Sequence, residues 1–312
     1  MKTTCKWWLG SLLAVALVVW SGCLPAGSPD ARVKAYVSIP PLAYFVERVG
    51  GRYVEVSVLV KPGQSPHIFE PTPRQMAGLS RANVYFSVGF PFEERLLTKI
   101  TAMNGHLKVV DTCRGVVSRT LSAEEIESHE AGEHGHEEHG HAGHGHAAGE
   151  PDPHVWLSPR LARIQAANIC NGLAVIDRVH AADYERNLKA FQADLDRVDA
   201  RLTRALAPLR GRAFLVYHPA FGYFADAYGL RQVPVEVGGK EPSARQLASL
   251  IDRARRDGIR VIFVQPRFPR RSAEWVARAI GGAVVPMDDL PRNYLKNLED
   301  MAAKLQAAPR GK

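Results

Sequence analysis

Short strand-like stretches alternate with helical stretches along most of this 312-residue chain, on both sides of one long uninterrupted helix. The strand-like stretches are apolar and rich in β-branched residues, and the helical stretches repeat apolar residues at a helical period. Strands are expected at 33–37, 54–60, 84–88, 107–110, 213–217, 232–237, 261–264 and 283–285. Helices are expected at 41–49, 74–81, 92–102, 160–178, 221–228, 243–257, 271–280 and 292–306. Strands joined by helical crossovers predict mostly parallel sheets, so the fold class is α/β with two (β/α) lobes.

The long helix is predicted at 181–208 from an apolar stripe that begins at Tyr184 and repeats in steps of three and four residues. Neither glycine nor proline interrupts 181–207, and Pro208 marks the end. At ~1.5 Å per residue such a helix is roughly 35–40 Å long, comparable to a whole domain. We interpret it as a rigid strut between the lobes, with an ordinary packed surface helix as the alternative. The predicted domains are an N-terminal lobe at 23–180, the connecting helix at 181–208 and a C-terminal lobe at 209–312.

The first 22 residues are expected to be a signal peptide. Lys2 and Lys6 precede a 14-residue apolar run, which is typical of a signal peptide and shorter than the ~20 residues that span a bilayer. The residues that end at Cys23 resemble the signal for lipidation of that cysteine, although Trp20 stands where this motif usually has leucine. Cleavage near Ala26 is the alternative. Either route predicts an exported, periplasmic protein, with a lipid anchor through Cys23 in the first case.

The charge and the cysteine content argue against nucleic-acid binding and against a zinc site made of cysteines. The net charge of +8 falls to +6 without the signal peptide, and the arginines lie along helical stretches with no aromatic-basic motif, so nucleic acid is not expected as a partner. Outside the signal and its processing site, Cys113 and Cys170 remain. In an oxidising compartment they either pair or stay as two buried thiols. No CxxC motif is present, which argues against a cysteine zinc site.

A histidine-rich run at 129–146 contains seven of the chain's 12 histidines, separated by glycine, alanine and acidic residues. They are His129, His134, His136, His139, His141, His144 and His146. Such a segment buries too little apolar surface to offset its ordering entropy, so we expect a mobile loop. Imidazole is a favoured ligand for zinc, copper and nickel, so the loop is predicted to offer many weak metal sites. A spacer without affinity for metals is the alternative.

Four other residues indicate a fixed metal site. His67 and His218 each come just after a predicted strand, and Asp288 follows the last strand. His154 lies between a turn signal and an apolar pair, at the start of the helix that follows the loop. Ligands of α/β sheets gather at the carboxyl ends of strands, so these side chains are expected to meet between the lobes. Three imidazoles and one carboxylate make a tetrahedral set for zinc.

Several segments together resemble the zinc-specific substrate-binding proteins of bacterial metal ABC importers, the ZnuA-like or cluster A-I family. The segments are Pro66-His-Ile-Phe-Glu-Pro-Thr-Pro73, the acidic histidine-rich run, Asp152-Pro-His-Val-Trp-Leu-Ser-Pro159, Tyr217-His-Pro-Ala-Phe-Gly-Tyr-Phe224 and Gly239-Lys-Glu-Pro-Ser243. The resemblance covers essentially the whole mature chain. It implies two lobes joined by a rigid helix, with metal bound between them.

The resemblance implies that His67, His154 and His218 are metal ligands. Asp288 matches a position where some members supply a fourth, carboxylate ligand, while others use water or a nearby glutamate. Asp289 stands where many members have proline, which leaves open which aspartate coordinates. Manganese-binding relatives tend to have glutamate at the third position, so the histidine at 218 favours zinc.

The predicted function is therefore capture of Zn²⁺ outside the cytoplasmic membrane and its delivery to the permease of an ABC importer, by a monomer that is not an enzyme. A zinc metallochaperone is a further expected partner. The alternatives are a manganese or iron carrier on the same fold, a surface adhesin and a secreted zinc hydrolase. The hydrolase would need an open coordination position and a general base. The chain lacks HExxH, and His136-Glu-Glu-His139 has the wrong spacing.

Overall fold

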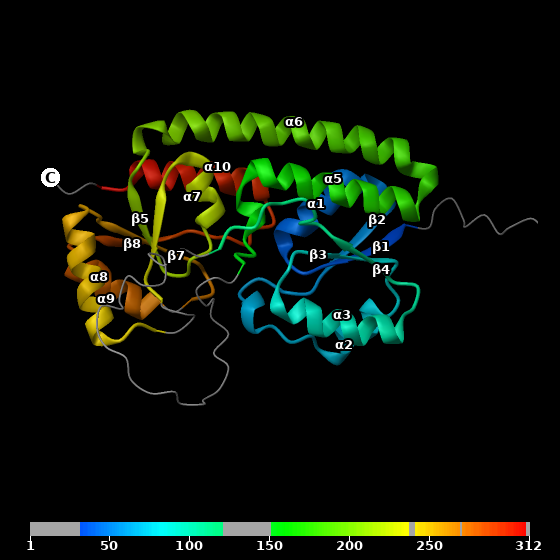
Figure 1. Ribbon diagram of the computed structural model, residues 1–312, viewed down its shortest axis with the longest axis horizontal. Coiled ribbons are helices and arrows are strands. Elements are labelled where there is room, and N and C mark those ends of the chain that lie inside the picture. Colours follow the sequence, from blue (N-terminus) through cyan, green and yellow to red (C-terminus); the bar gives the residue numbers. More distant parts are fainter. Residues whose placement is uncertain (1–31, 121–150, 237–240, 269, 310–312) are drawn as a thin grey trace, which may run out of the picture. The chain divides into compact units, whose positions relative to one another are not determined.

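Two four-stranded sheets form the framework of the chain (Figure 1). The structure, a computed structural model, describes residues 32–120, 151–236, 241–268 and 270–309. The strands are β1 (Val33–Val37), β2 (Val54–Val58), β3 (Val84–Ser87), β4 (Lys108–Asp111), β5 (Ala213–Val216), β6 (Arg231–Pro234), β7 (Val261–Val264) and β8 (Ala283–Pro286). Their orders are β2-β1-β3-β4 and β6-β5-β7-β8, and all the pairings between them are parallel. The predicted α/β class with two lobes of one plan is confirmed.

Helices connect consecutive strands and cover the sheets. They are α1 (Pro40–Gly50), α2 (Pro73–Leu79), α3 (Pro91–Met103), α5 (Pro159–Ile176), α6 (Ala181–Leu206), α7 (Gly222–Tyr228), α8 (Ala244–Arg256), α9 (Arg270–Ala279) and α10 (Tyr294–Ala307). Helices α1, α2, α3 and α5 each carry proline in the first turn, where its missing N–H costs no hydrogen bond. We call β1–β4 with α1–α3 and α5 the first lobe, and β5–β8 with α7–α10 the second lobe.

The two inner strands of the second sheet, β5 and β7, are buried on both faces. Along β5, Leu215 packs into a cluster with α8 and α9, while its neighbours Phe214 and Val216 join the core on the opposite face. In β7, Ile262 and Phe263 divide in the same way. Successive side chains of a strand point to opposite faces, so a strand covered on both sides is apolar throughout. This is why these segments appear in the sequence as continuous apolar runs.

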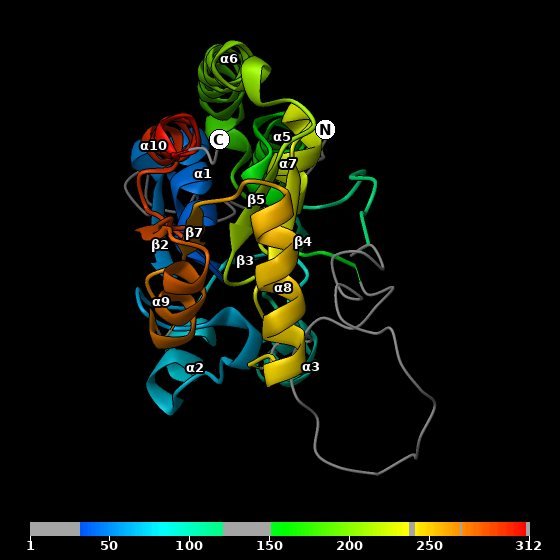
Figure 2. The same ribbon diagram turned by 90° about the vertical axis from the view of Figure 1, so that its left-hand side faces the viewer.

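Helix α6 runs along both lobes (Figure 1), and Figure 2 looks down its length. It is 26 residues long and buries the predicted stripe, with Leu188 half-buried. The buried members are Tyr184, Phe191, Leu195, Val198, Leu202 and Leu206. The helix contacts α1 and α5 of the first lobe and α7 and α10 of the second. Helix α6 thus packs against both lobes through this apolar stripe.

The last helix also ties the second lobe to the first. Tyr294, at the start of α10, packs edge-on against Phe45 of α1, with ring centroids 4.7 Å apart. Its buried hydroxyl donates to the main-chain carbonyl of Trp156 over 2.5 Å. One hydrophobic cluster accordingly extends from the first sheet through α6 to α10. Separating the lobes would expose this apolar surface, so the packing opposes a large hinge motion.

Other predictions have mixed outcomes. Cys113 and Cys170 are free thiols and do not pair, but only Cys170 is buried, while Cys113 is partly exposed. Burial raises the pKa of Cys113 to about 12. Among the described residues no helix has both the length and the apolar character to cross a bilayer. The predicted signal peptide and Cys23 lie outside the described residues, and so does the histidine-rich run at 129–146.

Candidate metal centre

The histidines predicted as ligands lie where the main chain leaves or enters regular structure. His67 lies in a short 3-10 turn, Pro66–Ile68, after β2, and the hydroxyl of Ser65 caps this turn by accepting from the main-chain N–H of His67. His218 comes two residues after β5. His154 precedes a second 3-10 turn that leads into α5. The histidines that follow β2 and β5 lie at the carboxyl edges of their sheets, where α/β folds bind ligands.

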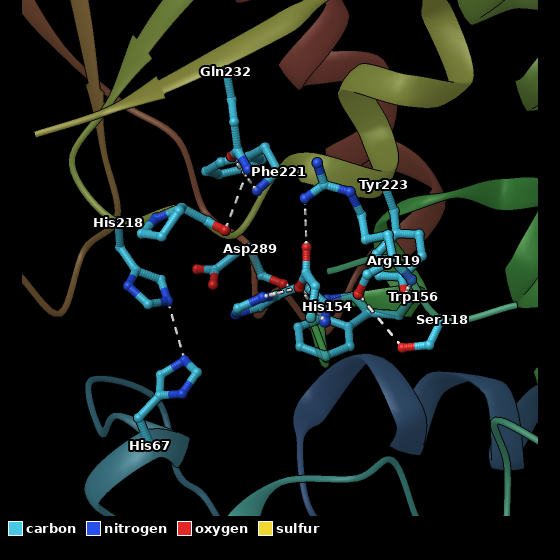
Figure 3. Close-up of polar contacts among 12 residues, drawn as sticks. His67, Ser118, Arg119, His154, Trp156, His218, Phe221, Tyr223, Gln232 and Asp289 are labelled. Carbon is cyan, nitrogen blue, oxygen red and sulfur yellow. Dashed lines mark hydrogen bonds and ion pairs between the residues drawn. The ribbon is translucent and has the colours of Figure 1, made fainter. Parts of the chain in front are cut away.

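The structure brings these three histidines together. One ring nitrogen from each of His67, His154 and His218 lies within 4.8 Å of the other two, and all three side chains are buried. The Nε2 atoms of His67 and His218 are 3.0 Å apart, and this contact joins the two lobes (Figure 3). Two nitrogens bound tetrahedrally to one zinc ion, at ~2.0–2.1 Å each, would be about 3.3 Å apart. The cluster therefore fits a single small ion with little rearrangement.

A carboxylate orients His154. Asp152 accepts from the main-chain N–H of His154 at 2.9 Å and lies 2.7 Å from its Nδ1. The other oxygen of Asp152 accepts from Arg119, which also pairs with Asp226 in α7. Burial opposes ionisation of Asp152, but its interactions with His154 and the Arg119 charge hold the pKa of the carboxyl below its usual range. A carboxylate at Nδ1 fixes the proton there, so that Nε2 is the ring nitrogen that could bind a metal.

His218 has the same arrangement with a different carboxylate. Its Nδ1 lies 2.5 Å from Oε1 of Glu236, which is buried just beyond the end of β6. The side-chain amide of Gln265 bonds both the N–H and the carbonyl of His218, so the backbone is fixed as well. Burial first, and then the nearby His154 and the Arg267 charge, hold the pKa of His218 well below its usual range. The neutral imidazole that results is the form that binds metals.

Aromatic side chains surround the histidines. Phe90 lies edge-on to His67, with centroids 5.4 Å apart, and Phe268 stacks on His218 at 5.0 Å. Trp156 lies 5.3 Å from the ring of His154. These rings exclude water from the site and lower its dielectric, which strengthens an interaction between a cation and its ligands.

The two aspartates at the end of β8 have different environments. The structure does not bring Asp288 into the histidine group: its Oδ1 accepts from the main-chain N–H of Leu290 at 2.9 Å, and burial raises its pKa. Asp289 is fully buried, and Arg267 donates to both of its carboxylate oxygens, at 2.5 and 2.6 Å. Burial opposes its ionisation, but the Arg267 charge lowers its pKa below the usual range. Asp288 stays a prediction for the fourth ligand.

The carboxylates that orient the histidines were not predicted from the sequence. Asp152 is two residues before His154 in the same motif, and Glu236 is an acid near the end of the strand predicted at 232–237. An acidic residue next to a candidate histidine, or at the same edge of the sheet, was the available signal. The Arg267–Asp289 pair gave no such signal, because its members are 22 residues apart and belong to different loops.

Comparison with known proteins places the chain in a family. Residues 36–308 match the family described as ZnuA, zinc-uptake complex component A, periplasmic. The high-affinity zinc uptake system protein ZnuA of Bacillus subtilis (strain 168) is 30% identical over 273 residues, which cover 85% of this chain and 81% of that protein.

Two solved structures are similar along nearly their whole length. A crystal structure of ZnuA has 38% identity and a TM-score of 0.78, and the match covers 89% of this chain and 99% of the other. A ZnuA deletion mutant that lacks residues 138–173 of its own chain, with zinc bound, has 37% identity and a TM-score of 0.78, and covers 90% and 99%. The chain therefore belongs to the ZnuA family of periplasmic zinc-uptake components.

Proposed function

We propose that this chain is the zinc-binding component of a bacterial metal ABC importer, which captures Zn²⁺ outside the cytoplasmic membrane and delivers it to a membrane permease. One observation carries the proposal: ring nitrogens of His67, His154 and His218 converge within 4.8 Å in a buried site. The family and the zinc-bound relative agree with it. The ion is cargo, so binding and release are the whole of the chemistry, and no bond is made or broken in the chain.

The surroundings of the histidines support reversible capture of zinc. Asp152 and Glu236 each hold one imidazole by Nδ1, so that Nε2 is presented to the ion without reorganisation. Nitrogen ligands suit zinc better than manganese, which prefers oxygen. Asp288 is proposed as the fourth ligand, on the position that the family resemblance implies. If Asp288→Asn weakened zinc binding as strongly as loss of a histidine, it would coordinate; an unchanged affinity would exclude it.

Part of the proposed function depends on residues outside the described ranges. The signal peptide at 1–22 would export the chain, and Cys23 would anchor it if lipidated. The histidine-rich run would collect zinc when it is scarce or buffer an excess, and a metallochaperone would be a second partner beside the permease. We propose that the protein acts as a monomer.

A competition titration tests the metal specificity. The mature protein is titrated with zinc and with manganese, each against a chelator of known affinity, at less than one equivalent so that the tightest site is filled first. We expect zinc to bind far more tightly than manganese, and His218→Ala to abolish the tight zinc site. Tighter binding of manganese would instead support the manganese carrier, and turnover of ester, peptide or phosphate substrates by zinc-loaded protein would support the hydrolase.

A further inference from the structure

A buried ion pair lies beside the histidines and is not used by the function proposed above. The guanidinium of Arg267 donates through both terminal nitrogens to both oxygens of Asp289, at 2.5 and 2.6 Å. Only 4% of the Arg267 side chain and none of the Asp289 side chain is exposed. Such a two-pronged, solvent-excluded pair is geometrically specific, because the planar fork of arginine matches the carboxylate.

The Arg267–Asp289 pair lies next to the three histidines. Figure 3 shows the carboxylate of Asp289 near His218 and His154. The main-chain carbonyl of Asp289 accepts from the indole N–H of Trp156 at 2.7 Å, and Phe268, the neighbour of Arg267, stacks on His218. Asp289 is therefore a buried carboxylate beside the histidines, in addition to Asp152 and Glu236, and both of its oxygens are bonded to Arg267.

A carboxylate in this position would change the metal preference if it were released. Carboxylate oxygen is a harder ligand than imidazole and suits manganese and magnesium, whereas nitrogen suits zinc. A carboxylate held by a bidentate arginine has its lone pairs directed at the guanidinium. The arginine also cancels the charge of Asp289, so the pair adds little attraction for a dication.

We propose that Arg267 is a specificity-determining residue that withholds Asp289 from the ion and so keeps the site selective for zinc over manganese. The inference rests on the proposed zinc-binding function. Arg267 acts through Asp289 and does not itself touch the metal, so its removal should add a ligand and not merely weaken the site.

Four variants of the full mature chain test this inference. Arg267→Gln removes the fork, and Arg267→Lys keeps the charge but holds one oxygen at a time. The double variant Arg267→Gln with Asp289→Asn also removes the carboxylate that is released. Arg278→Gln, at an exposed arginine of α9, is the matched control. Manganese affinity is read from the electron paramagnetic resonance signal of free Mn²⁺, zinc affinity by chelator competition, and folding of the metal-free protein by circular dichroism.

We expect Arg267→Gln to increase the manganese affinity relative to zinc by about ten- to a hundredfold, the range typical of residues that orient metal ligands. Arg267→Lys should give a smaller increase in manganese affinity relative to zinc. The double variant and Arg278→Gln should have the same ratio of the two affinities as the unaltered chain. The inference would be overturned if folded Arg267→Gln kept a ratio of manganese to zinc affinity within about twofold of that of the unaltered chain. If the glutamine variant does not fold, the same result in Arg267→Lys would overturn it. The same gain in the double variant would also overturn it. Failure of the proposed function looks different: the unaltered chain would not bind zinc through its histidines at all.

Discussion

Trp156 donates its indole N–H to the main-chain carbonyl of Asp289 over 2.7 Å, and this bond joins the first lobe to the second beside the histidines. Both side chains are fully buried. The carbonyl oxygen of Trp156 accepts in turn from the hydroxyl of Tyr294, so one residue ties the loop before α5 to two segments of the second lobe. Trp156 is two residues from His154, which means that the position of one of the three converging histidines depends on contacts with the opposite lobe.

Trp156→Phe should therefore lower both stability and metal affinity. Phenylalanine keeps an aromatic ring in the core but leaves the buried carbonyl of Asp289 without this donor, a loss of about 1–3 kcal/mol. We expect urea unfolding of the metal-free protein to show a decrease of this size, together with weaker zinc binding. Trp275→Phe is the control, because the Trp275 side chain is 48% exposed in α9. Equal effects of the two changes would show that the cross-lobe bond is unimportant.

The three histidines and the histidine-rich run should contribute very differently to zinc binding. His67→Ala removes one of three converging imidazoles, and we expect the tight zinc site to be lost, whereas deletion of 129–146 should leave its affinity nearly unchanged and reduce only the number of weak sites. Isothermal titration calorimetry separates the two classes by stoichiometry and affinity. His106→Ala, at an exposed histidine, is the control. Loss of the tight site on deletion of 129–146 would assign it to the run instead.

Zinc binding through these imidazoles should weaken in acid. Ligands must be deprotonated to bind, and an ordinary imidazole has a pKa near ~6.5. The pKa of His218 lies well below this, so its proton competes with the metal only at lower pH than a free imidazole would. Zinc affinity measured from pH 8 to 5 should therefore stay high near neutrality and fall toward pH 5. A flat profile over the whole range would contradict histidine ligation.

The sequence allowed a correct prediction of the parts that depend on local pattern. The stripe on α6 and the strand–helix alternation follow from periodicity, and they led directly to the lobes and to the edges where ligands gather. His67, His154 and His218 could be selected because each lies beside a predicted element and within a family motif. Periodicity says nothing, however, about which loops face each other once two lobes pack.

The contacts that the sequence did not reveal are those between loops of different elements. Glu236 reaches His218 from the next strand, and Arg267 reaches Asp289 across 22 residues, so both pairs depend on tertiary packing. For the same reason, the assignment of Asp288 over Asp289 could not be decided from two adjacent aspartates. Their side chains leave the backbone in different directions, and only the packing of the β8 loop sets which of them meets Arg267.

Glu236→Gln should weaken zinc binding by about ten- to a hundredfold without unfolding the protein, because the amide keeps the shape but loses the charge that fixes the proton on Nδ1 of His218. Chelator competition measures the affinity. Glu274→Gln, a partly exposed acid of α9, is the control. An affinity equal to that of the unaltered chain would show that Glu236 does not position His218.

Glu93 should make stability depend on pH near neutrality. Its buried carboxylate accepts from the main-chain N–H groups of Val88, Gly89 and Phe90, and Ser38 also donates to it. Burial raises its pKa to about 7, against the opposing effect of these hydrogen bonds. Between the unfolded and folded pKa values the folded state binds more protons, so this contribution to stability is present in acid and is lost as the pH rises through 7.

Glu93→Gln removes that titration. From pH 5.5 to 8.5, the free energy of unfolding of the unaltered chain should fall by about 2 kcal/mol relative to Glu93→Gln. Urea unfolding of metal-free protein at several pH values measures the difference, and Glu94→Gln, at the exposed neighbouring acid, should follow the unaltered chain. Parallel curves for the unaltered chain and Glu93→Gln would mean that Glu93 is ionised throughout, held by its three N–H donors. Because the ring of Phe90 packs against His67, that result would mean that the surroundings of this histidine do not change over this pH range.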